Sequence, residues 1–238
     1  MITAKENAMR LYRHEQQEYQ SIMGQGIINN VPVTGFYERA EGGNGKDWFG
    51  VNWSQKPEEP APMPIGPYLM DDVCDWKEVI QFPNLDDFDW EQAAQKDRIP
   101  SFDRENNMLY QMIHNGIMER FQNLMSYEDA LCSMLTDPDE CLDLFYAIAD
   151  YKCKLIDKLA EYYQPDVICY HDDWGTQKGL LFSPDTWRDL LKAPTKQIVD
   201  HCHSKGIFFE LHSDGMVKDL VPEIVEDLGV DSLDHGSL

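Results

Sequence analysis

The sequence predicts an α/β fold in which parallel strands alternate with helices. Three observations support this prediction: apolar segments of strand length recur along the second half, helical segments separate them, and polar residues follow the strand ends. Successive parallel strands need a helical crossover, so the alternation indicates an α/β barrel or a doubly wound sheet. The sequence contains neither GxGxxG nor GxxxxGK[ST], so no nucleotide-binding motif supports the doubly wound sheet.

Residues 1–100 are expected to form a layer of helices and loops. Thr3-Ala-Lys-Glu6 is a capping box, which predicts a helix over residues 4–14. Residues 24–68 are rich in glycine, proline and aromatic residues, and we expect an ordered, irregular lining with a short strand. Short helices are expected near residues 75–81 and 87–97.

Residues 101–238 are expected to supply the strand–helix units, within one domain that covers residues 1–238. Predicted strands lie at 108–114, 166–170, 207–212 and 230–233. Predicted helices lie near 116–125, after the cap Ser126, from the cap Asp137 to Tyr163, after Ser183, and over Met216–Leu228 with Gly229 as its end. Pro194 is expected to break the helix that begins after Ser183 from a second helix.

Charge and composition exclude several classes of partner. Asp and Glu number 43 and Lys and Arg 20, so the net charge of −23 argues against nucleic acid and anionic membranes. No apolar run approaches the roughly 20 residues that span a bilayer. The charged N-terminal segment lacks the apolar core of a signal peptide, so a cytoplasmic protein is expected. The six cysteines lack a CxxC spacing and are expected to be free thiols, mostly in the core.

Polar residues crowd the ends of two predicted strands, where active sites of parallel α/β folds lie. Glu210, His212 and Asp214 share one face of their strand. Burying these groups without partners is costly, so they form either a metal site, an acid–base pair or a hydrogen-bonded structural cluster. Asp172 and Asp173 follow the other strand and point to opposite faces, so one of them is expected to enter the mouth and the other to cap a turn.

One further motif, His201-Cys202-His203, resembles a metal site in composition. It lies at the end of a predicted helix, where histidine interacts favourably with the helix dipole. We therefore expect a structural or surface role for it.

Several motifs together resemble the uroporphyrinogen decarboxylase-like superfamily. They are Asp172-Asp173-Trp-Gly-Thr-Gln177, Phe182-Ser-Pro184, Pro194-x-Lys196, His212-Ser-Asp-Gly215 and the opening segment TAKENAMRLYRHE. The resemblance covers most of the chain and is strongest over residues 166–233. It implies a (β/α)8 TIM barrel with its active site at the C-terminal mouth. Such a barrel takes about 250 residues, so we expect this chain to hold a barrel that is incomplete at its C-terminus.

The superfamily contains decarboxylases and corrinoid-linked methyltransferases. Resemblance to the decarboxylases implies an arginine-rich element that grips substrate carboxylates, yet residues 20–60 contain only Arg39, Lys46 and Lys56 as cations. The methyltransferase branch, exemplified by methylcobamide:coenzyme M methyltransferases, fits better. It implies methyl transfer between a small substrate or thiol acceptor and a corrinoid protein. A uroporphyrinogen decarboxylase and a barrel that only binds its ligand remain alternatives.

The methyltransferase branch also implies a metal site. Its zinc is held by a histidine, a cysteine two residues later and a further cysteine. His212 matches the histidine, Asp214 stands in place of the first cysteine, and the second has no counterpart before Leu238. A carboxylate in place of a thiolate shifts preference towards harder ions. We predict His212 and Asp214 as ligands of zinc or another divalent metal, and Asp172, Asp173 and Glu210 as catalytic residues.

Overall fold

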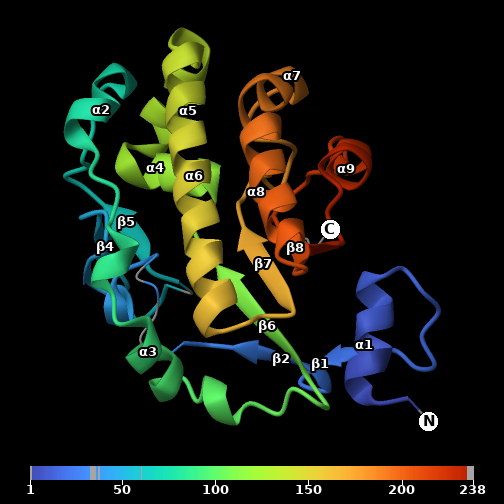
Figure 1. The fold of residues 1–238 in the computed structure, drawn as a ribbon. Coiled ribbons are helices and arrows are strands. Elements are labelled where there is room, and N and C mark those ends of the chain that lie inside the picture. Colours follow the sequence, from blue (N-terminus) through green and yellow to red (C-terminus); the bar gives the residue numbers. More distant parts are fainter. Residues whose placement is uncertain (1, 33–35, 37, 60, 235–238) are drawn as a thin grey trace.

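A curled parallel sheet of six strands forms the centre of the fold (Figure 1). The computed structural model describes residues 2–32, 36, 38–59 and 61–234. The sheet has the order β1-β2-β6-β7-β8-β9, with strands Ile22–Met23, Gly26–Asn30, Met108–Ile113, Val167–His171, Phe208–His212 and Ser232–Asp234. A separate antiparallel sheet has the order β3-β4-β5, with strands Gly45–Lys46, Asn52–Ser54 and Met63–Ile65. The architecture is α/β, and the curled parallel sheet is compatible with an incomplete TIM barrel.

Helices surround the parallel sheet: the first packs on its inner face, and the long helices between the later strands cover its outer face. They are α1 Ala4–Tyr12, α2 Trp76–Val79, α3 Trp90–Lys96, α4 Ile117–Leu124, α5 Tyr127–Thr136, α6 Pro138–Tyr162, α7 Pro184–Thr186, α8 Lys192–Ser204 and α9 Val221–Glu223. Five-residue π-helical turns, Trp187–Leu191 and Ile224–Leu228, follow α7 and α9. Helices α6 and α8 lie side by side on the sheet (Figure 1).

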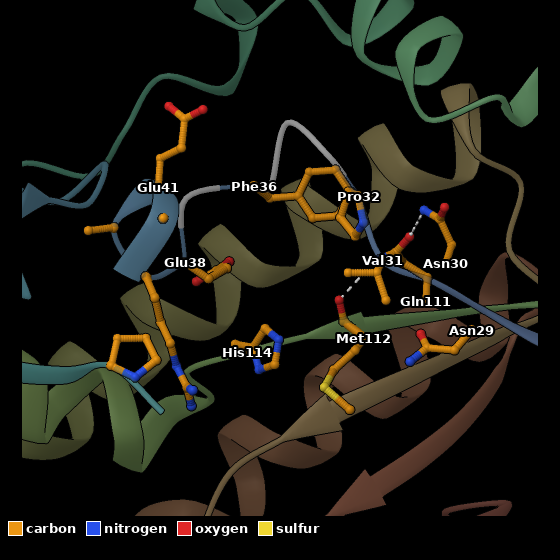
Figure 2. A pocket seen from close by; sticks show the side chains of 14 residues that line it. Asn29, Asn30, Val31, Pro32, Phe36, Glu38, Glu41, Gln111, Met112 and His114 are labelled. Atoms are coloured by element: carbon orange, nitrogen blue, oxygen red, sulfur yellow. Dashed lines mark hydrogen bonds between the residues drawn. The ribbon is translucent and has the colours of Figure 1, made fainter. Parts of the chain in front are cut away.

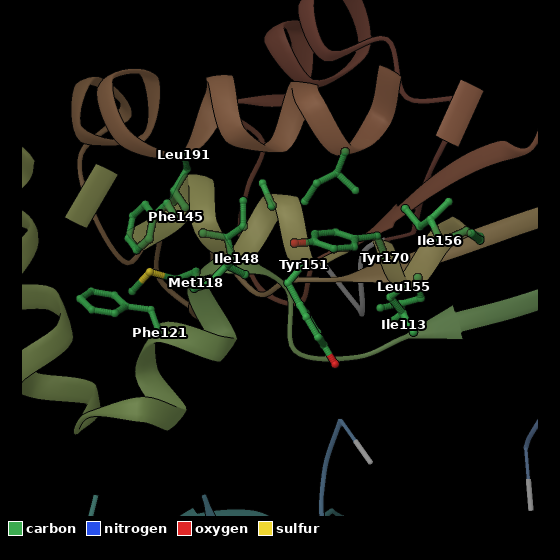
Figure 3. Packing of buried hydrophobic residues seen from close by; sticks show 14 of the residues in the cluster. Ile113, Met118, Phe121, Phe145, Ile148, Tyr151, Leu155, Ile156, Tyr170 and Leu191 are labelled. Atoms are coloured by element: carbon green, nitrogen blue, oxygen red, sulfur yellow. The ribbon is translucent and has the colours of Figure 1, made fainter. Parts of the chain in front are cut away.

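The two faces of the parallel sheet belong to two separate cores. On the outer face, residues such as Ile113 and Tyr170 pack against Leu155 and Ile156 of α6 (Figure 3). On the inner face, a smaller cluster joins sheet residues to α1; its buried members are Ala8, Tyr12, Ile27, Met108, Tyr110, Val167 and Cys169. Strands that are buried on both faces are typical of parallel α/β architectures. Alternation along each strand therefore decides which residues face the barrel interior.

The predicted strands of the second half are confirmed, with ends that shift by one or two residues. Two predicted helix caps are also confirmed: the Thr3 hydroxyl accepts a hydrogen bond from the Glu6 N–H at 3.1 Å, and the Ser126 hydroxyl accepts one from Asp129 at 3.0 Å. The predicted cap Asp137 is wrong, because its side chain makes no cap hydrogen bond to α6 and instead accepts from the Thr136 hydroxyl at 2.6 Å. Pro138 nevertheless begins the helix as expected.

The first hundred residues contribute two strands to the parallel sheet; a short strand was expected within residues 24–68, but its place in this sheet was not. Strand β2 pairs in parallel with β6, and Ile27 lies opposite Met108. The predicted boundary at residue 100 therefore does not separate a loop layer from the sheet. Gly26–Asn30 contains only two apolar residues, and glycine and asparagine are poor strand formers. Pairing with β6 overrides this weak local preference.

Two helix boundaries also differ from expectation. The helix predicted from Met216 begins only at Val221, although Gly229 ends its π-helical turn in the left-handed conformation as predicted. Pro194 does not break the helix, because helical residues continue from α7 through the π-helical turn Trp187–Leu191 into α8, where Pro194 is the third residue.

Four buried charged residues attach the glycine- and proline-rich segment to the helices; we call them the buried charge network. Arg120 of α4 contacts Asp47 at 2.6 Å and Glu38 at 3.1 Å, and Lys152 of α6 contacts Glu38 at 2.9 Å. The side chains of Arg120 and Lys152 are fully buried. The Arg120 guanidinium also lies over the Phe49 ring. These contacts confirm that the segment, over its described residues, forms an ordered lining.

The cysteines agree with expectation only in part. All six are free, but only Cys141, Cys169 and Cys202 are buried, whereas Cys74 and Cys132 are exposed. Within the described part of the chain, no helix combines the length and apolarity that crossing a membrane requires.

Candidate functional site

Three histidines lie in a row at the C-terminal ends of neighbouring strands. His171 ends β7 and His212 ends β8, and the parallel register places them directly opposite each other. Their rings stack with centroids 4.3 Å apart. His114 follows β6, and its ring centroid lies 5.6 Å from that of His171. The row therefore marks the mouth of the curled sheet.

Two of these histidines form a potential metal site with a carboxylate. His171, Asp173 and His212 each offer a ligand atom, and these atoms all lie within 4.8 Å of one another. All three residues are half-buried. Two imidazoles and one carboxylate on adjacent strand ends are a common ligand set for divalent transition metals.

A second carboxylate orients each histidine. The Nδ1 atom of His171 lies 3.0 Å from Glu119 Oε1, and the Nδ1 atom of His212 lies 2.9 Å from Asp234 Oδ2. Metal-bound histidines usually donate their other ring N–H to such a partner, which fixes the ring and its tautomer. The Nδ1 atom of His212 is hydrogen-bonded to Asp234, so Nε2 is the atom that this ring offers to an ion, while His171 forms an ion pair with Glu119. The three candidate ligands, together with the carboxylates of Glu119 and Asp234 behind the two histidines, therefore fit a divalent metal.

The predicted ligand pair is brought together only in part. His212 belongs to the cluster, and its Nε2 lies 3.6 Å from Asp214 Oδ1. The Asp214 side chain is 58% exposed, and its backbone N–H donates to Asp173 Oδ1 at 2.7 Å. The geometry thus favours Asp173 as the carboxylate ligand and places Asp214 at the rim. The close approach of the two strand-end loops requires Gly215, since a Cβ there would lie 2.4 Å from the backbone of Gly175.

Asp172 lies behind the cluster, although it neighbours Asp173 in sequence. Its buried carboxylate accepts hydrogen bonds from the backbone N–H groups of Met118 and Glu119 at 3.2 and 2.9 Å, and from the Trp174 indole at 2.9 Å. Burial and the nearby Glu119 raise the pKa of Asp172 to about 7. Asp172 therefore caps the N-terminus of α4 from the end of β7. Of the two alternatives for this pair, Asp173 faces the mouth and Asp172 has the capping role.

Glu210 lies deeper inside the sheet than His212. Its carboxylate accepts hydrogen bonds from the hydroxyls of Tyr12 at 3.0 Å and Tyr110 at 2.5 Å. Glu210 is buried and lines neither of the cavities described below. Its surroundings match the hydrogen-bonded structural cluster, and its predicted catalytic role is not favoured by this placement.

The His201-Cys202-His203 motif has the expected surface role, since His201 contacts Asp157 and His203 contacts Asp231.

Two cavities meet at the mouth. The cavity beside the metal-ligand cluster has a volume of about 530 Å³, and its lining includes His171, Asp173 and Glu119 together with the aromatic side chains of Trp53, Tyr68 and Tyr127. The second cavity, of about 360 Å³, lies over the ends of β2 and β6, where Met112 and His114 face Val31 and Phe36 (Figure 2). Both cavities share Arg39 and Pro62. Together they offer a partly apolar, partly charged space for a small molecule.

The electrostatics of the histidine row differ along its length. Burial, reinforced by the charge of Arg39, lowers the pKa of His114 to about 3, so this ring is neutral. Burial also disfavours the charged form of His171, but the hydrogen bond and charge of Glu119 outweigh it, and the pKa of His171 is raised. Burial and the nearby Glu119 raise the pKa of Asp173. The negative potential of the carboxylates at His171 and His212 favours a bound cation.

The sequence prediction missed His171, Glu119, Asp234 and Arg39. A signal for His171 existed, because His171 directly follows the predicted strand 166–170 and His212 ends the next predicted strand. Glu119 and Arg39 carried no such signal, since they reach the mouth from α4 and from the irregular segment, whose positions depend on tertiary packing.

Comparisons with known proteins support the fold. No family model matches this chain, and no curated protein matches it. Among solved structures, a methyltransferase from Methanosarcina mazei is similar over 98% of this chain and 76% of its own, with a TM-score of 0.66 and 14% sequence identity. A xylose isomerase-like TIM barrel protein from Mycobacterium smegmatis in complex with magnesium has 15% identity and a TM-score of 0.35 over 61% of this chain and 45% of its own, which is too low to carry an argument. The chain therefore shares its fold with the Methanosarcina protein.

Proposed function

We propose that this protein is a metal-dependent methyltransferase that moves a methyl group between a small substrate or thiol acceptor and a corrinoid carried by a partner protein. The observation that carries the proposal is the cluster of His171, Asp173 and His212 at the mouth of the curled sheet. The fold shared with the Methanosarcina methyltransferase supports the same reaction class. The motifs that resemble corrinoid-linked methyltransferases favour the corrinoid partner.

The ligand set indicates which ions fit. Two imidazoles suit zinc, iron, cobalt and nickel, and one carboxylate in place of thiolates favours somewhat harder ions. When bound, such an ion supplies Lewis-acid chemistry or lowers the pKa of a thiol that coordinates it. Residues of the chain supply the rest: Glu119 and Asp234 hold the two imidazoles in orientation, and each does so through Nδ1.

The walls of the larger cavity orient the substrate and exclude water from the reacting group. Trp53 is buried, while Tyr68 and Tyr127 are partly exposed at the entrance. Aromatic walls bind an apolar substrate body, and a methyl transfer requires that the reacting atoms be held in line. The strongly acidic surface, with a net charge of −23, favours a partner protein that presents a basic patch.

Metal titration of the purified protein tests the site directly. We expect stoichiometric binding of Co²⁺ with the absorption of a nitrogen- and oxygen-ligated ion, and loss of at least a hundredfold in affinity in His171→Ala and His212→Ala. His201→Ala is the matched control, because His201 pairs with Asp157 on the surface of α8. Equal affinity in wild type and His212→Ala would show that the cluster is not the metal site.

Methyl transfer to or from a purified corrinoid protein tests the reaction. The absorption spectrum of the corrinoid reports the change in the ligand of its cobalt. We expect the transfer rate to fall in His171→Ala and His212→Ala, as metal affinity does, and to be retained in His201→Ala. Tight metal binding without transfer from any methylated donor or to any thiol would refute the methyltransferase function while leaving the metal site intact.

A further inference from the structure

Two adjacent residues of the glycine- and proline-rich segment face two adjacent residues of α4, and in each pair an acid faces a base. Glu38 lies 3.1 Å from Arg120, and Nη2 of Arg39 lies 3.9 Å from Oε1 of Glu119. The first pair belongs to the buried charge network, whereas both residues of the second line the 530 Å³ cavity at the mouth. The two crossed ion pairs therefore connect the interior of the protein with the candidate metal site.

The two pairs differ in how completely they are formed. Arg120 is fully buried and donates to the Glu38 carboxylate at 3.1 Å and to the Glu38 carbonyl oxygen at 2.8 Å, which fixes the backbone beside Arg39. Arg39 and Glu119 lie beyond hydrogen-bonding distance. Nε of Arg39 and Oε2 of Glu119 are buried and have no hydrogen-bond partner among the described residues. This second pair is therefore open, with a donor and an acceptor still to be satisfied.

Glu119 also contacts a candidate metal ligand. Its Oε1 atom lies 3.0 Å from Nδ1 of His171, and its side chain is only 13% exposed. Within the described part of the chain, its ion-pair partners are His171 and Arg39. Histidine binds a metal ion as a neutral imidazole, so Arg39 is then the one cationic side chain that remains paired with Glu119. A largely buried carboxylate without such a partner is costly.

Arg39 is held in place from two sides. Its backbone follows Glu38, which the buried charge network fixes, and its guanidinium lies 5.8 Å from the centroid of the Trp53 ring. Arginine in this position keeps its charge under all ordinary conditions. The segment therefore presents a fixed positive charge to the face of Glu119 that is not occupied by His171.

We propose that Arg39 is a positioning residue of the metal site, which pairs with Glu119 while Glu119 orients the imidazole of His171. The inference rests on the proposed function, because it requires His171 to bind a metal ion. It gives the glycine- and proline-rich segment a contribution to metal affinity, although Arg39 is not itself a ligand.

The sign of the effect distinguishes this role from simple charge repulsion. A positive charge near a metal site repels the ion, so electrostatics alone predicts tighter metal binding when Arg39 is replaced by a neutral residue. A positioning role predicts weaker binding, because Glu119 loses its partner and holds the His171 ring less well.

Calorimetric titration of Arg39 variants with Zn²⁺, without a corrinoid protein, tests the inference. We expect Arg39→Met to lower the affinity about tenfold, the lower end of the range for residues that support metal ligands. Arg39→Lys keeps the charge and should retain most of the affinity. Lys56→Met is the control, since it removes a positive charge from an exposed position of the same segment and should leave the affinity unchanged. An affinity that rises or stays constant in Arg39→Met would overturn the inference.

A double-mutant cycle shows whether Arg39 acts through Glu119. Arg39→Met should cause little further loss of affinity in the Glu119→Gln background, because the group that Arg39 holds has already been altered. Losses that add in the double variant would contradict the proposed role. Coupled losses without methyl transfer would refute only the proposed function, whereas methyl transfer together with additive losses would refute only this inference.

Discussion

The protein contains two clusters of charged residues that lie close together but differ in what they leave open. In the buried charge network, Glu38, Asp47, Arg120 and Lys152 bond to one another, and Lys152 also donates to the carbonyl oxygen of His114 at 2.9 Å. At the mouth, the cluster of His171, Asp173 and His212 faces a cavity. Thus Lys152 holds the backbone of the strand end on which the histidine row begins.

The difference separates a structural cluster from a functional one. Both clusters combine acids and bases, and composition alone does not distinguish them. The buried charge network is closed to solvent, so its role is structural: it attaches the glycine- and proline-rich segment to α4 and α6. The cluster at the mouth instead faces a cavity, which His171 and Asp173 line. Variants that separate stability from binding test this distinction.

The largest expected effect is on stability, in the buried charge network. Arg120→Met leaves Asp47 and Glu38 buried with fewer partners, and we expect the free energy of unfolding to fall by about 3–5 kcal/mol. Urea denaturation followed by circular dichroism measures it. Lys77→Met is the control, because its ion pair with Asp143 is exposed and should contribute little. A loss in Arg120→Met no larger than in the control would show that the network does not anchor the segment.

A smaller effect is expected on metal affinity when the carboxylate that pairs with His171 is replaced. Glu119→Gln removes the charge beside His171 Nδ1, and we expect metal affinity to fall about 10- to 100-fold. Calorimetric titration with Zn²⁺ provides the measurement. Glu128→Gln removes the same charge from an exposed position at the start of α5 and should leave the affinity unchanged. Unchanged affinity in Glu119→Gln would mean that Glu119 does not orient the ligand.

Asp172 and Asp173 provide a matched pair within two adjacent residues. Asp172→Asn replaces an acceptor of three hydrogen bonds with an amide, and we expect a loss of about 1–3 kcal/mol in stability with metal affinity largely retained. Asp173→Asn should show the opposite pattern, with weakened metal binding and little change in stability. Chemical denaturation and metal titration of both variants decide the assignment, and identical behaviour of the two would contradict it.

The smallest expected effect lies on the surface and depends on pH. Hydrogen bonds from Arg188 and Lys192 lower the pKa of Glu223 from 4.5 to about 2. A carboxylate whose pKa is lower in the folded state stabilises the protein above its unfolded-state pKa and loses this contribution as the pH falls towards 2. The stability difference between wild type and Glu223→Gln should therefore be constant above pH 5 and shrink below it. A difference that grows on acidification would be evidence against the ion pairs.

Much of the fold followed from local sequence. The strands Val167–His171 and Phe208–His212 lie where their apolar residues predicted them, and the Ser126 and Thr3 caps have their expected partners. The short strand expected within residues 24–68 could not be placed, because the stability of β2 comes from pairing with β6 and not from its own residues. The Asp137 cap failed because a neighbouring hydroxyl competes for the same carboxylate.

For the site, the sequence by itself located the chemistry at two strand ends and identified His212 and Asp173 there. Only the tertiary structure decided the partners. Parallel register brought His171 beside His212, packing of α4 delivered Glu119, and the irregular segment carried Arg39 to the same cavity. Side-chain direction along a strand is a local property with a period of two, whereas contacts between elements depend on how helices and loops pack over the sheet. Alternation predicted that Asp172 and Asp173 diverge, and the packing of α4 decided that Asp172 is the one that caps a helix.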